Sequence, residues 1–226
     1  YLIFNEGYAA TSGASPVRDG LCREAIRLGE IMQTLLPGDA EIQGLLALML
    51  LHDARRPARR DAAGDLMTLE AQDRSLWDQD QIGRGRTLLI GAPARGEIGP
   101  FQVQAAISAV HADAVDFDRT DWREICLLYD KLYALQPSPI VALNGAVARS
   151  FADGAAAGLA ALDGLDPAGM LAGYMPFHLA RADILRRAGD PASAHAAYRL
   201  AWELTDNDSE RKFLETRLAE TGPANC

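Results

Sequence analysis

The stretch that decides the fold is LCREAIRLGEIMQTLLPGDAEIQGLLALMLL, residues 21–51. Its first part carries apolar residues at spacings of four, three, four and three, the period of an amphipathic α-helix; they are Leu21, Ala25, Leu28, Met32 and Leu35. Pro37-Gly38-Asp39 then ends this helix and starts the next one. Residues 42–51 are apolar on nearly every side, so we predict a central, buried helix there.

Helical periodicity continues through the rest of the chain, and no segment has a convincing strand pattern. Residues 1–4 have strand composition, but Asn5-Glu6-Gly7 turns the chain at once. We expect one or two helices over residues 66–90, interrupted near Gly83 and Gly85. The chain is therefore predicted to be all-α and built of helical hairpins, with an irregular helical bundle in its N-terminal half.

The C-terminal half shows an internal repeat typical of a tetratricopeptide-like α-solenoid. In residues 177–207, Gly189-Asp190 falls at the turn between two helices, and the second helix then offers small, large and small residues at Ala194, Tyr198 and Ala201. Gly154 precedes Gly189 by 35 residues, but Leu159 and Asp163 fit the small and aromatic positions less well. An irregular bundle is the alternative.

The composition limits the classes of function. The chain has 226 residues and a formal net charge of −9, whereas a protein that binds nucleic-acid phosphates needs basic residues. We therefore expect no direct nucleic-acid contact, unless a local basic patch provides it. No apolar run has membrane-spanning length, so we expect no membrane partner. Three widely spaced cysteines predict free thiols in a reducing compartment, hence a cytoplasmic location.

Seven segments, in this order, resemble the C-terminal extension of one group of extracytoplasmic-function RNA polymerase sigma factors. They are YLIFNEGY (1–8), EAIRLGEIMQTLLPGDAEIQGLLALMLLHDARRPAR (24–59), QDRSLWD (72–78), GPFQVQAAISAVHA (99–112), TDWREICLLYDKL (120–132), PSPIVALNGAVA (137–148) and HLARADILRRAGD (178–190). One departure is Asn144-Gly145, where that family is expected to carry Asn-Arg.

This resemblance implies a helical, tetratricopeptide-like domain that follows two promoter-reading sigma domains. Residues 1–16 would be a linker from those missing domains. A single helical domain would span 17–220, with an N-terminal part at 17–95, a tetratricopeptide-like part at 99–220 and a tail at 221–226. The implied function is regulatory, through contacts with the sigma domains of the same chain, with RNA polymerase core or with a signalling protein. The alternatives are a free-standing peptide-binding scaffold and, third, a small-ligand-binding or enzymatic domain.

An arginine cluster follows the predicted buried helix, at Arg55, Arg56, Arg59 and Arg60. It could bind an acidic partner, a phosphate or RNA polymerase. It could equally offset the carbonyls and the dipole at the end of the helix. The segment QDRSLWD contributes Asp73, Arg74, Trp77 and Asp78, and a buried ion-pair network between the two segments would be architectural.

The sequence offers no catalytic, metal or cofactor site. None of its four histidines forms a ligand motif, and His52 and His111 follow apolar helical runs, where core histidines are expected. The segment Gly83-Arg84-Gly85-Arg86 lacks the ending of a phosphate-binding loop. We therefore expect no cofactor and no enzyme activity. Tyr174 and Trp202 are candidates for holding an extended peptide on the solenoid.

Overall fold

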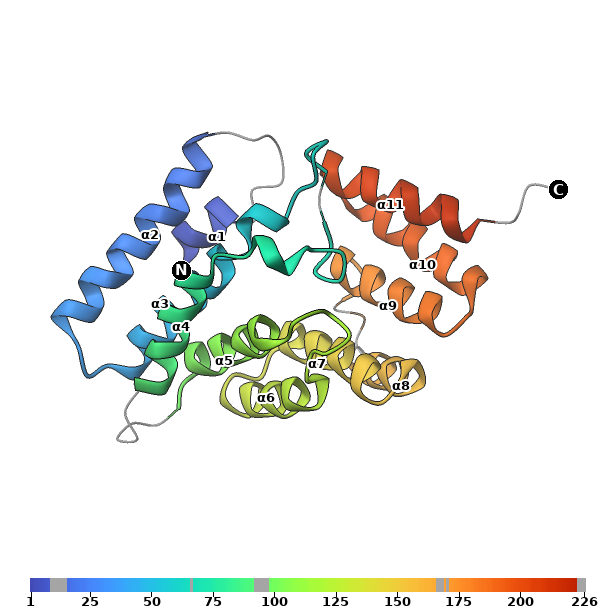
Figure 1. The fold of residues 1–226 in the computed structure, drawn as a ribbon. Helices are drawn as coiled ribbons and strands as arrows, with labels where there is room; N and C mark the ends of the chain where they lie inside the picture. The colour runs from blue at the N-terminus through green and yellow to red at the C-terminus, as the bar shows by residue number, and fades with distance from the viewer. Residues whose placement is uncertain (9–15, 66, 92–97, 166–168, 170, 223–226) are drawn as a thin grey trace. The chain divides into compact units, whose positions relative to one another are not determined.

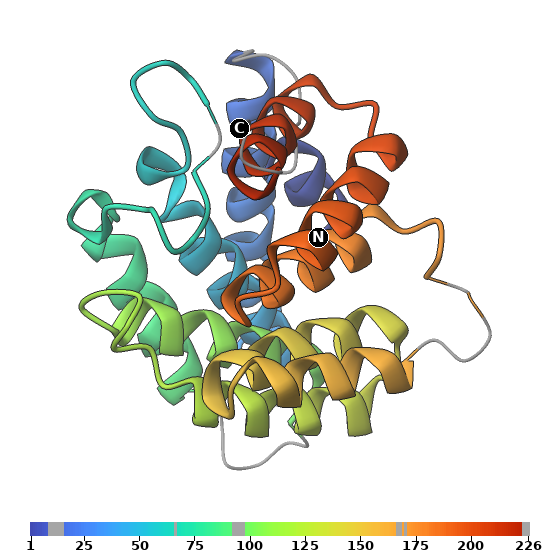
Figure 2. The same ribbon diagram turned by 90° about the vertical axis from the view of Figure 1, so that its right-hand side faces the viewer.

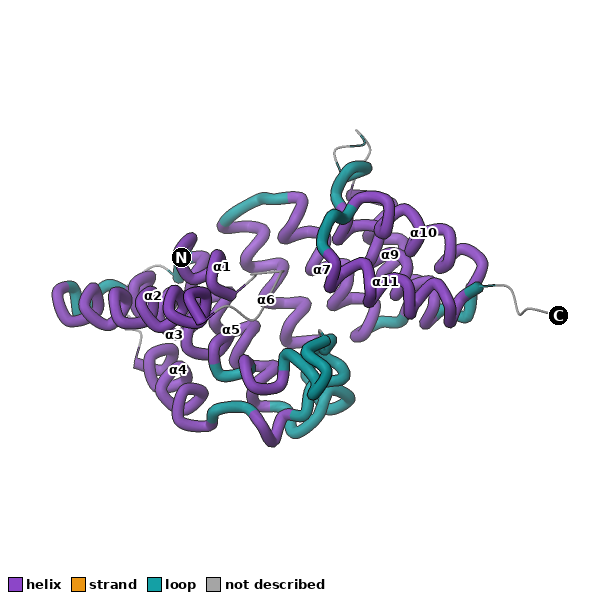
Figure 3. The backbone as a smooth tube through the Cα atoms, turned by 90° about the horizontal axis from the view of Figure 1, so that it is seen from above, coloured by secondary structure: helices purple, strands orange, loops and turns teal. Residues whose placement is uncertain are grey.

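The computed structural model describes residues 1–8, 16–65, 67–91, 98–165, 169 and 171–222. Within these ranges the protein is all-α, as predicted, with eleven α-helices and no β-strand (Figure 3). The chain divides into two compact units, unit 1 over residues 1–121 and unit 2 over residues 122–226.

Unit 1, which is coloured blue to green in Figure 1, is built around one buried helix. Its α-helices are α1 (Leu2–Tyr8), α2 (Pro16–Leu35), α3 (Ala40–Asp53), α4 (Gln79–Gly91) and α5 (Pro100–Asp113), with short 3-10 turns at Arg56–Ala58 and Arg74–Leu76. Helix α3 packs against α2, α4 and α5, and its residues from 46 to 51 are almost fully buried. The Asp39 side chain accepts a hydrogen bond from the Ile42 amide, so the predicted start of this central helix is confirmed.

The face of α2 that packs against the rest of the unit differs from the predicted one. The buried positions are Cys22, Ala25 and Gly29. Most of the larger residues of the predicted stripe are exposed: Leu28 by 37%, Met32 by 43% and Leu35 by 72%. Small residues let two helix backbones approach closely, and a Cβ at Gly29 would come within 2.9 Å of the Met49 methyl group. The helix is thus turned so that its small residues, rather than its large ones, meet α3.

The predicted interruption near Gly83 and Gly85 is wrong, because α4 runs unbroken from Gln79 to Gly91. Gly85 is buried, and a Cβ there would lie only 2.9 Å from the Leu51 Cγ atom. The glycine serves close packing of α4 on α3, and a helix interior tolerates it at a cost of about 1 kcal/mol relative to alanine.

The domain boundaries differ from those expected. Residues 2–8, assigned to a linker, form helix α1 and place Phe4 in a core cluster with Cys22, Leu46 and Met49. The division between compact units falls after Asp121 rather than at residues 95–99. Most of the expected tail lies outside the described residues, and α11 includes Thr221.

Unit 2 is a series of antiparallel helix pairs, coloured yellow-green to red in Figure 2. It contains α6 (Trp122–Leu135), α7 (Pro139–Ala152), α8 (Ala155–Leu165), α9 (Met175–Arg187), α10 (Pro191–Leu204) and α11 (Asp208–Thr221). Helix α7 packs on α8, and α9 packs on α10. The tight turns of both hairpins use a glycine with positive φ, Gly154 at +94° and Gly189 at +79°.

The repeat in unit 2 is clearer in the structure than in the sequence, because its period is 36 residues and not 35. Helices α7 and α9 begin at Pro139 and Met175, and α8 and α10 begin at Ala155 and Pro191. With this spacing Gly158 matches Ala194 and Leu162 matches Tyr198, and all four side-chain positions are buried. The poor fit of Leu159 and Asp163 therefore came from a register error of one residue.

Candidate functional site

The arginine cluster after α3 lies against other parts of unit 1. The Arg59 guanidinium stacks 3.8 Å above the Tyr8 ring and donates to the Tyr8 carbonyl at 2.6 Å. Arg55 donates to the Tyr8 hydroxyl at 3.2 Å. Arg56 pairs with the buried carboxylate of Asp53, and Arg60 donates to the exposed Gly64 carbonyl at 2.6 Å. Burial lowers the pKa of Arg59. The cluster therefore holds α1 to the end of α3, and Arg60 joins the loop after α3 to itself at Gly64.

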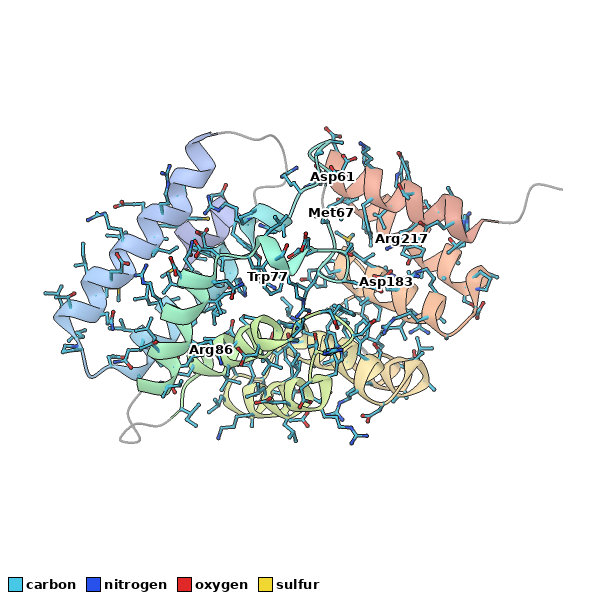
Figure 4. All side chains as sticks on the ribbon, in the orientation of Figure 1. Asp61, Met67, Trp77, Arg86, Asp183 and Arg217 are labelled. Carbon is cyan, nitrogen blue, oxygen red and sulfur yellow. The ribbon has the colours of Figure 1, made fainter. Side chains whose placement is uncertain are left out.

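Arg74 holds the end of α5. Its Nη1 donates to the carbonyls of His111 and Ala114 at 2.6 and 2.8 Å, and its Nη2 donates to Thr120 at 3.2 Å. A cation that binds the last carbonyls of a helix satisfies unpaired acceptors and complements the helix dipole. Arg74 also lies 5.0 Å from the Trp77 ring centroid. Trp77 is buried in the cluster formed by α3, α4 and α5, on the segment that leads into α4 (Figure 4).

The two predicted aspartates of this segment begin local turns. Asp73 accepts from the Ser75 amide at 2.9 Å and thereby caps a 3-10 turn. Asp78 accepts from the Gln81 amide at 3.0 Å, and its own amide donates to the Ala54 carbonyl at 2.9 Å. A hydrogen bond from the Ser75 side chain, followed by that from its amide, lowers the pKa of Asp73, and the hydrogen bond from the Gln81 amide lowers the pKa of Asp78. The structure thus assigns the predicted arginine and QDRSLWD residues mainly to the connections within unit 1.

Two histidines of unit 1, His52 on α3 and His111 on α5, lie near these arginines. His52 Nε2 is 3.0 Å from the Ser108 hydroxyl, and its ring stacks on Tyr8. Burial, followed by the nearby charge of Arg55, holds the pKa of His52 well below its ordinary value. The same two causes lower the pKa of His111 to about 3. Both imidazoles are therefore neutral near pH 7, as expected for core histidines.

Glu41 is a structural residue that the sequence analysis missed. Its two carboxylate oxygens accept from the amides of Phe101 and Gln102, at 3.0 and 3.1 Å. These amides are at the N-terminus of α5, 60 and 61 positions further along the chain. Because that separation follows no local pattern, only the folded structure pairs them. Helix α5 is thus capped by Glu41 at its start and by Arg74 near its end.

An open groove of about 370 Å³ lies between α2, α3 and α4. Charges of both signs line it: Arg23 and Arg27 come from α2, Asp78 lies just before α4, and Asp80 lies in the first turn of α4. Arg84 and Glu30 form an ion pair between α4 and α2. Because charged residues line the groove, it suits charged side chains of another protein better than an apolar ligand.

The predicted peptide-contact residues of unit 2 pack against core clusters. Tyr174 lies against the cluster of Leu143, Ala146 and Ile184, and Trp202 lies against that of Tyr198 and Leu214. Arg211 is 5.5 Å above the Trp202 ring. Both aromatic side chains are partly buried, which leaves them a largely structural role.

The polar centre of unit 2 is a buried tyrosine. The Tyr198 hydroxyl donates to Asp183 on α9 and accepts from Arg186 at 3.3 Å. Burial, and then the hydrogen bond to Asp183, raises the pKa of Tyr198. Figure 4 shows Asp183 on α9 and Arg217 on α11 of the same unit. The hydrogen bond from Tyr198 on α10 to Asp183 on α9 joins these two helices.

The described ranges contain no group of three or more histidine, cysteine, aspartate or glutamate residues placed to hold a metal ion. Over the same ranges, no helix combines the length and apolarity needed to cross a membrane.

Two comparisons with known proteins give matches. Residues 1–92 match a family of unknown function, DUF6596. Over 218 residues the chain is 43% identical to a protein of Rhizobium meliloti (strain 1021) that is named uncharacterized protein R00370. That alignment covers 96% of this chain, while the chain spans about half (51%) of the relative. No solved structure matches.

Proposed function

We propose that this chain is a regulatory, protein-interaction part of an alternative RNA polymerase sigma factor, and that the parent protein acts in transcription initiation. The observation that carries the proposal is the ordered series of seven segments that resemble the C-terminal extension of such factors. The similar Rhizobium protein is about twice as long as this chain, which leaves room in a protein of that kind for further domains.

The geometry of unit 1 favours protein contact over catalysis. The charged residues that stand out in the sequence are engaged within the chain, with Arg59 on Tyr8 and Arg74 on the end of α5. What faces solvent instead is a set of helix surfaces, including exposed apolar residues on α2 and a groove lined by opposite charges. Such surfaces bind proteins. The net charge of −9 suits a basic partner and opposes contact with nucleic-acid phosphates.

Transcription in vitro tests the proposal. Purified RNA polymerase would be combined with the parent protein's own promoter and either the full-length parent or a form that lacks residues 1–226. Loss of transcription on truncation would place the chain within the initiation machinery, and increased transcription would identify a brake. Unchanged transcription by a folded, truncated parent contradicts the proposal and favours a scaffold unconnected with transcription.

A further inference from the structure

The second half of α2 presents an exposed apolar face, which the described residues of unit 1 leave uncovered. Five large apolar residues within nine positions are between 37% and 72% exposed: Leu28, Ile31, Met32, Leu35 and Leu36. At 100° per residue, the four that belong to the helix fall on one face. Isolated exposed apolar residues are ordinary, but a contiguous group of this kind marks an interaction site. We call these five residues the α2 apolar face.

This face is separate from the other surfaces of α2. The buried line of Cys22, Ala25 and Gly29 is turned from it by roughly a quarter of a turn. Residues Arg23, Ile26 and Glu30, which line the charged groove, lie about half a turn away, while Arg27 lies at the border between the groove and the apolar face. Helix α2 therefore uses one face to join α3, a second to line the groove, and leaves the apolar face open.

We infer that the α2 apolar face is the docking site for the sigma domains of the same parent chain, an inference that rests on the proposed function. The size of the face supports a partner within the same chain. From Leu28 to Leu35 the helix rises roughly 10 Å, and the face is about 10 Å wide. A stable complex between separate proteins needs about 800 Å² from each partner. The α2 apolar face alone is far smaller.

Charge also disfavours a second copy of the chain as the occupant. Two copies would each bring a net charge of −9 and would repel one another. A domain joined through the same polypeptide needs much less binding surface, because tethering gives it an effective concentration on the order of millimolar. The similar Rhizobium protein has about as many residues outside the matched region as within it, which is enough chain to supply such a domain.

Photo-cross-linking in the full-length parent tests this inference. Leu35, the most exposed residue of the face, would be replaced by p-benzoylphenylalanine, and a mixture of 14N- and 15N-labelled chains would be irradiated. We expect cross-links from position 35 to the sigma domains within a single isotope label. Cross-links between the two labels, or no cross-link to polypeptide, would overturn the inference.

A triple variant and a matched control sharpen the test. For this test p-benzoylphenylalanine replaces Ile31, so that Leu35 can be changed. The substitutions Leu28→Ser, Met32→Ser and Leu35→Ser should then lower the cross-linked fraction by about tenfold or more, because three apolar contacts are lost. Leu127→Ser, Leu200→Ser and Leu204→Ser change equally apolar, exposed residues of unit 2 and should leave it unchanged. Equal yields from both variants would contradict the inference.

This readout does not depend on transcription, so the two proposals can fail separately. Suppose that the parent gives intramolecular cross-links, but that its transcription is unchanged when residues 1–226 are removed. This result would refute the proposed function and leave the docking contact standing. Transcription that depends on residues 1–226, without any cross-link from the α2 apolar face, would refute the docking site alone.

Discussion

Units 1 and 2 are both helical, but different interactions join their helices. In unit 1, charged side chains connect segments far apart in sequence: Glu41 caps the start of α5, and Arg74 binds its last carbonyls. In unit 2, small residues bring neighbouring helices together, as at Gly158 and Ala194, and the buried Tyr198 packs in the same cluster as Ala194. Unit 1 also packs helices closely at Gly29, Gly44 and Gly85, so it is sensitive both to the size of its packing residues and to the loss of individual charges. Unit 2 is sensitive mainly to the size of its packing residues.

This difference affects how an unusual sequence motif should be interpreted. The arginines and QDRSLWD of unit 1 resemble a binding site in sequence, yet Arg59, Arg74 and Asp78 each bind a group within their own unit. A buried or half-buried charge needs such a partner, because an unpaired one costs several kcal/mol. Function is then expected on the surfaces that these contacts leave exposed.

The largest effects are expected where helix backbones touch. A Cβ at Gly44 would lie 2.6 Å from the Gln102 backbone nitrogen, so Gly44→Ala forces α3 and α5 apart and should lower the free energy of unfolding by about 3 kcal/mol. In unit 2, a Cβ at Gly158 would lie 2.9 Å from the Ser150 Cα. Gly158→Ala should cost about 2 kcal/mol, since better helix propensity offsets part of the strain.

Urea unfolding checks this prediction. Ala194→Gly is the matched control, because Ala194 holds the equivalent position in the second hairpin and already accommodates a Cβ. It should cost only about 1 kcal/mol. If Gly44→Ala and Gly158→Ala both unfold like the wild type, the close approach of these helices is refuted.

Removal of Arg74 should be as damaging as Gly44→Ala, and should destabilise only unit 1. Arg74→Ala leaves the carbonyls of His111 and Ala114 without their donor, and we expect a loss of about 3 kcal/mol. Fluorescence of a chain that keeps Trp77 but carries Phe at 122 and 202 would follow unit 1 alone. An Arg74→Ala variant as stable as the wild type would show that Arg74 does not hold the unit together.

Acidification should weaken unit 1 through its buried histidines. Their lowered pKa values mean that the unfolded chain, with a pKa of about 6.5, binds protons before the folded one does. The stabilising contribution is complete above pH 6.5 and is lost as the pH falls. For His111, with a folded pKa of about 3, the loss at pH 5 is about 2 kcal/mol.

The measurement is the free energy of unfolding at pH 7 and pH 5. His111→Gln keeps a polar side chain that takes up no proton, so the difference between the two pH values should shrink in this variant. The same pH dependence in His111→Gln and wild type would contradict the account of this histidine.

Loss of the cap at the other end of α5 should have the smallest effect. Glu41→Ala removes two charge-assisted hydrogen bonds from partly exposed amides and should cost about 1 kcal/mol, as other N-cap losses do. Glu41→Gln, which keeps one acceptor oxygen, should be intermediate. A larger loss from Glu41→Ala than from Arg74→Ala would reverse the order of importance at the two ends of α5.

The sequence predicted those parts of the fold that depend on local patterns. The all-α class, the buried helix α3 and its Asp39 cap follow from apolar spacing and turn residues. The orientation of α2 could not be predicted in this way. Periodicity locates an apolar stripe, but it does not show which face of the helix a neighbouring helix covers. The repeat of unit 2 was placed one residue out of register, since a single glycine pair, Gly154 and Gly189, fixed the count.

The sequence named candidate residues in unit 1 but not the contacts that their side chains make. Both segments of unit 1 were identified, and the architectural interpretation of their charges was one of two alternatives. Two partners were missed. Tyr8 binds Arg59, which lies 51 positions away, and Glu41 caps α5 at the Phe101 amide, which lies 60 positions away. Such separations appear only once the chain is folded.

The most direct test of the central claim, that the arginines of unit 1 are architectural, compares two neighbouring arginines in the full-length parent. Arg59 is stacked on Tyr8, whereas Arg60 reaches only an exposed carbonyl. We predict that Arg59→Ala lowers the free energy of unfolding by about 2 kcal/mol, while Arg60→Ala changes it by less than about 0.5 kcal/mol. Transcription at a temperature where both variants are folded should equal that of the wild type. Full stability combined with loss of transcription in Arg59→Ala would contradict the claim and make the cluster a partner-binding surface.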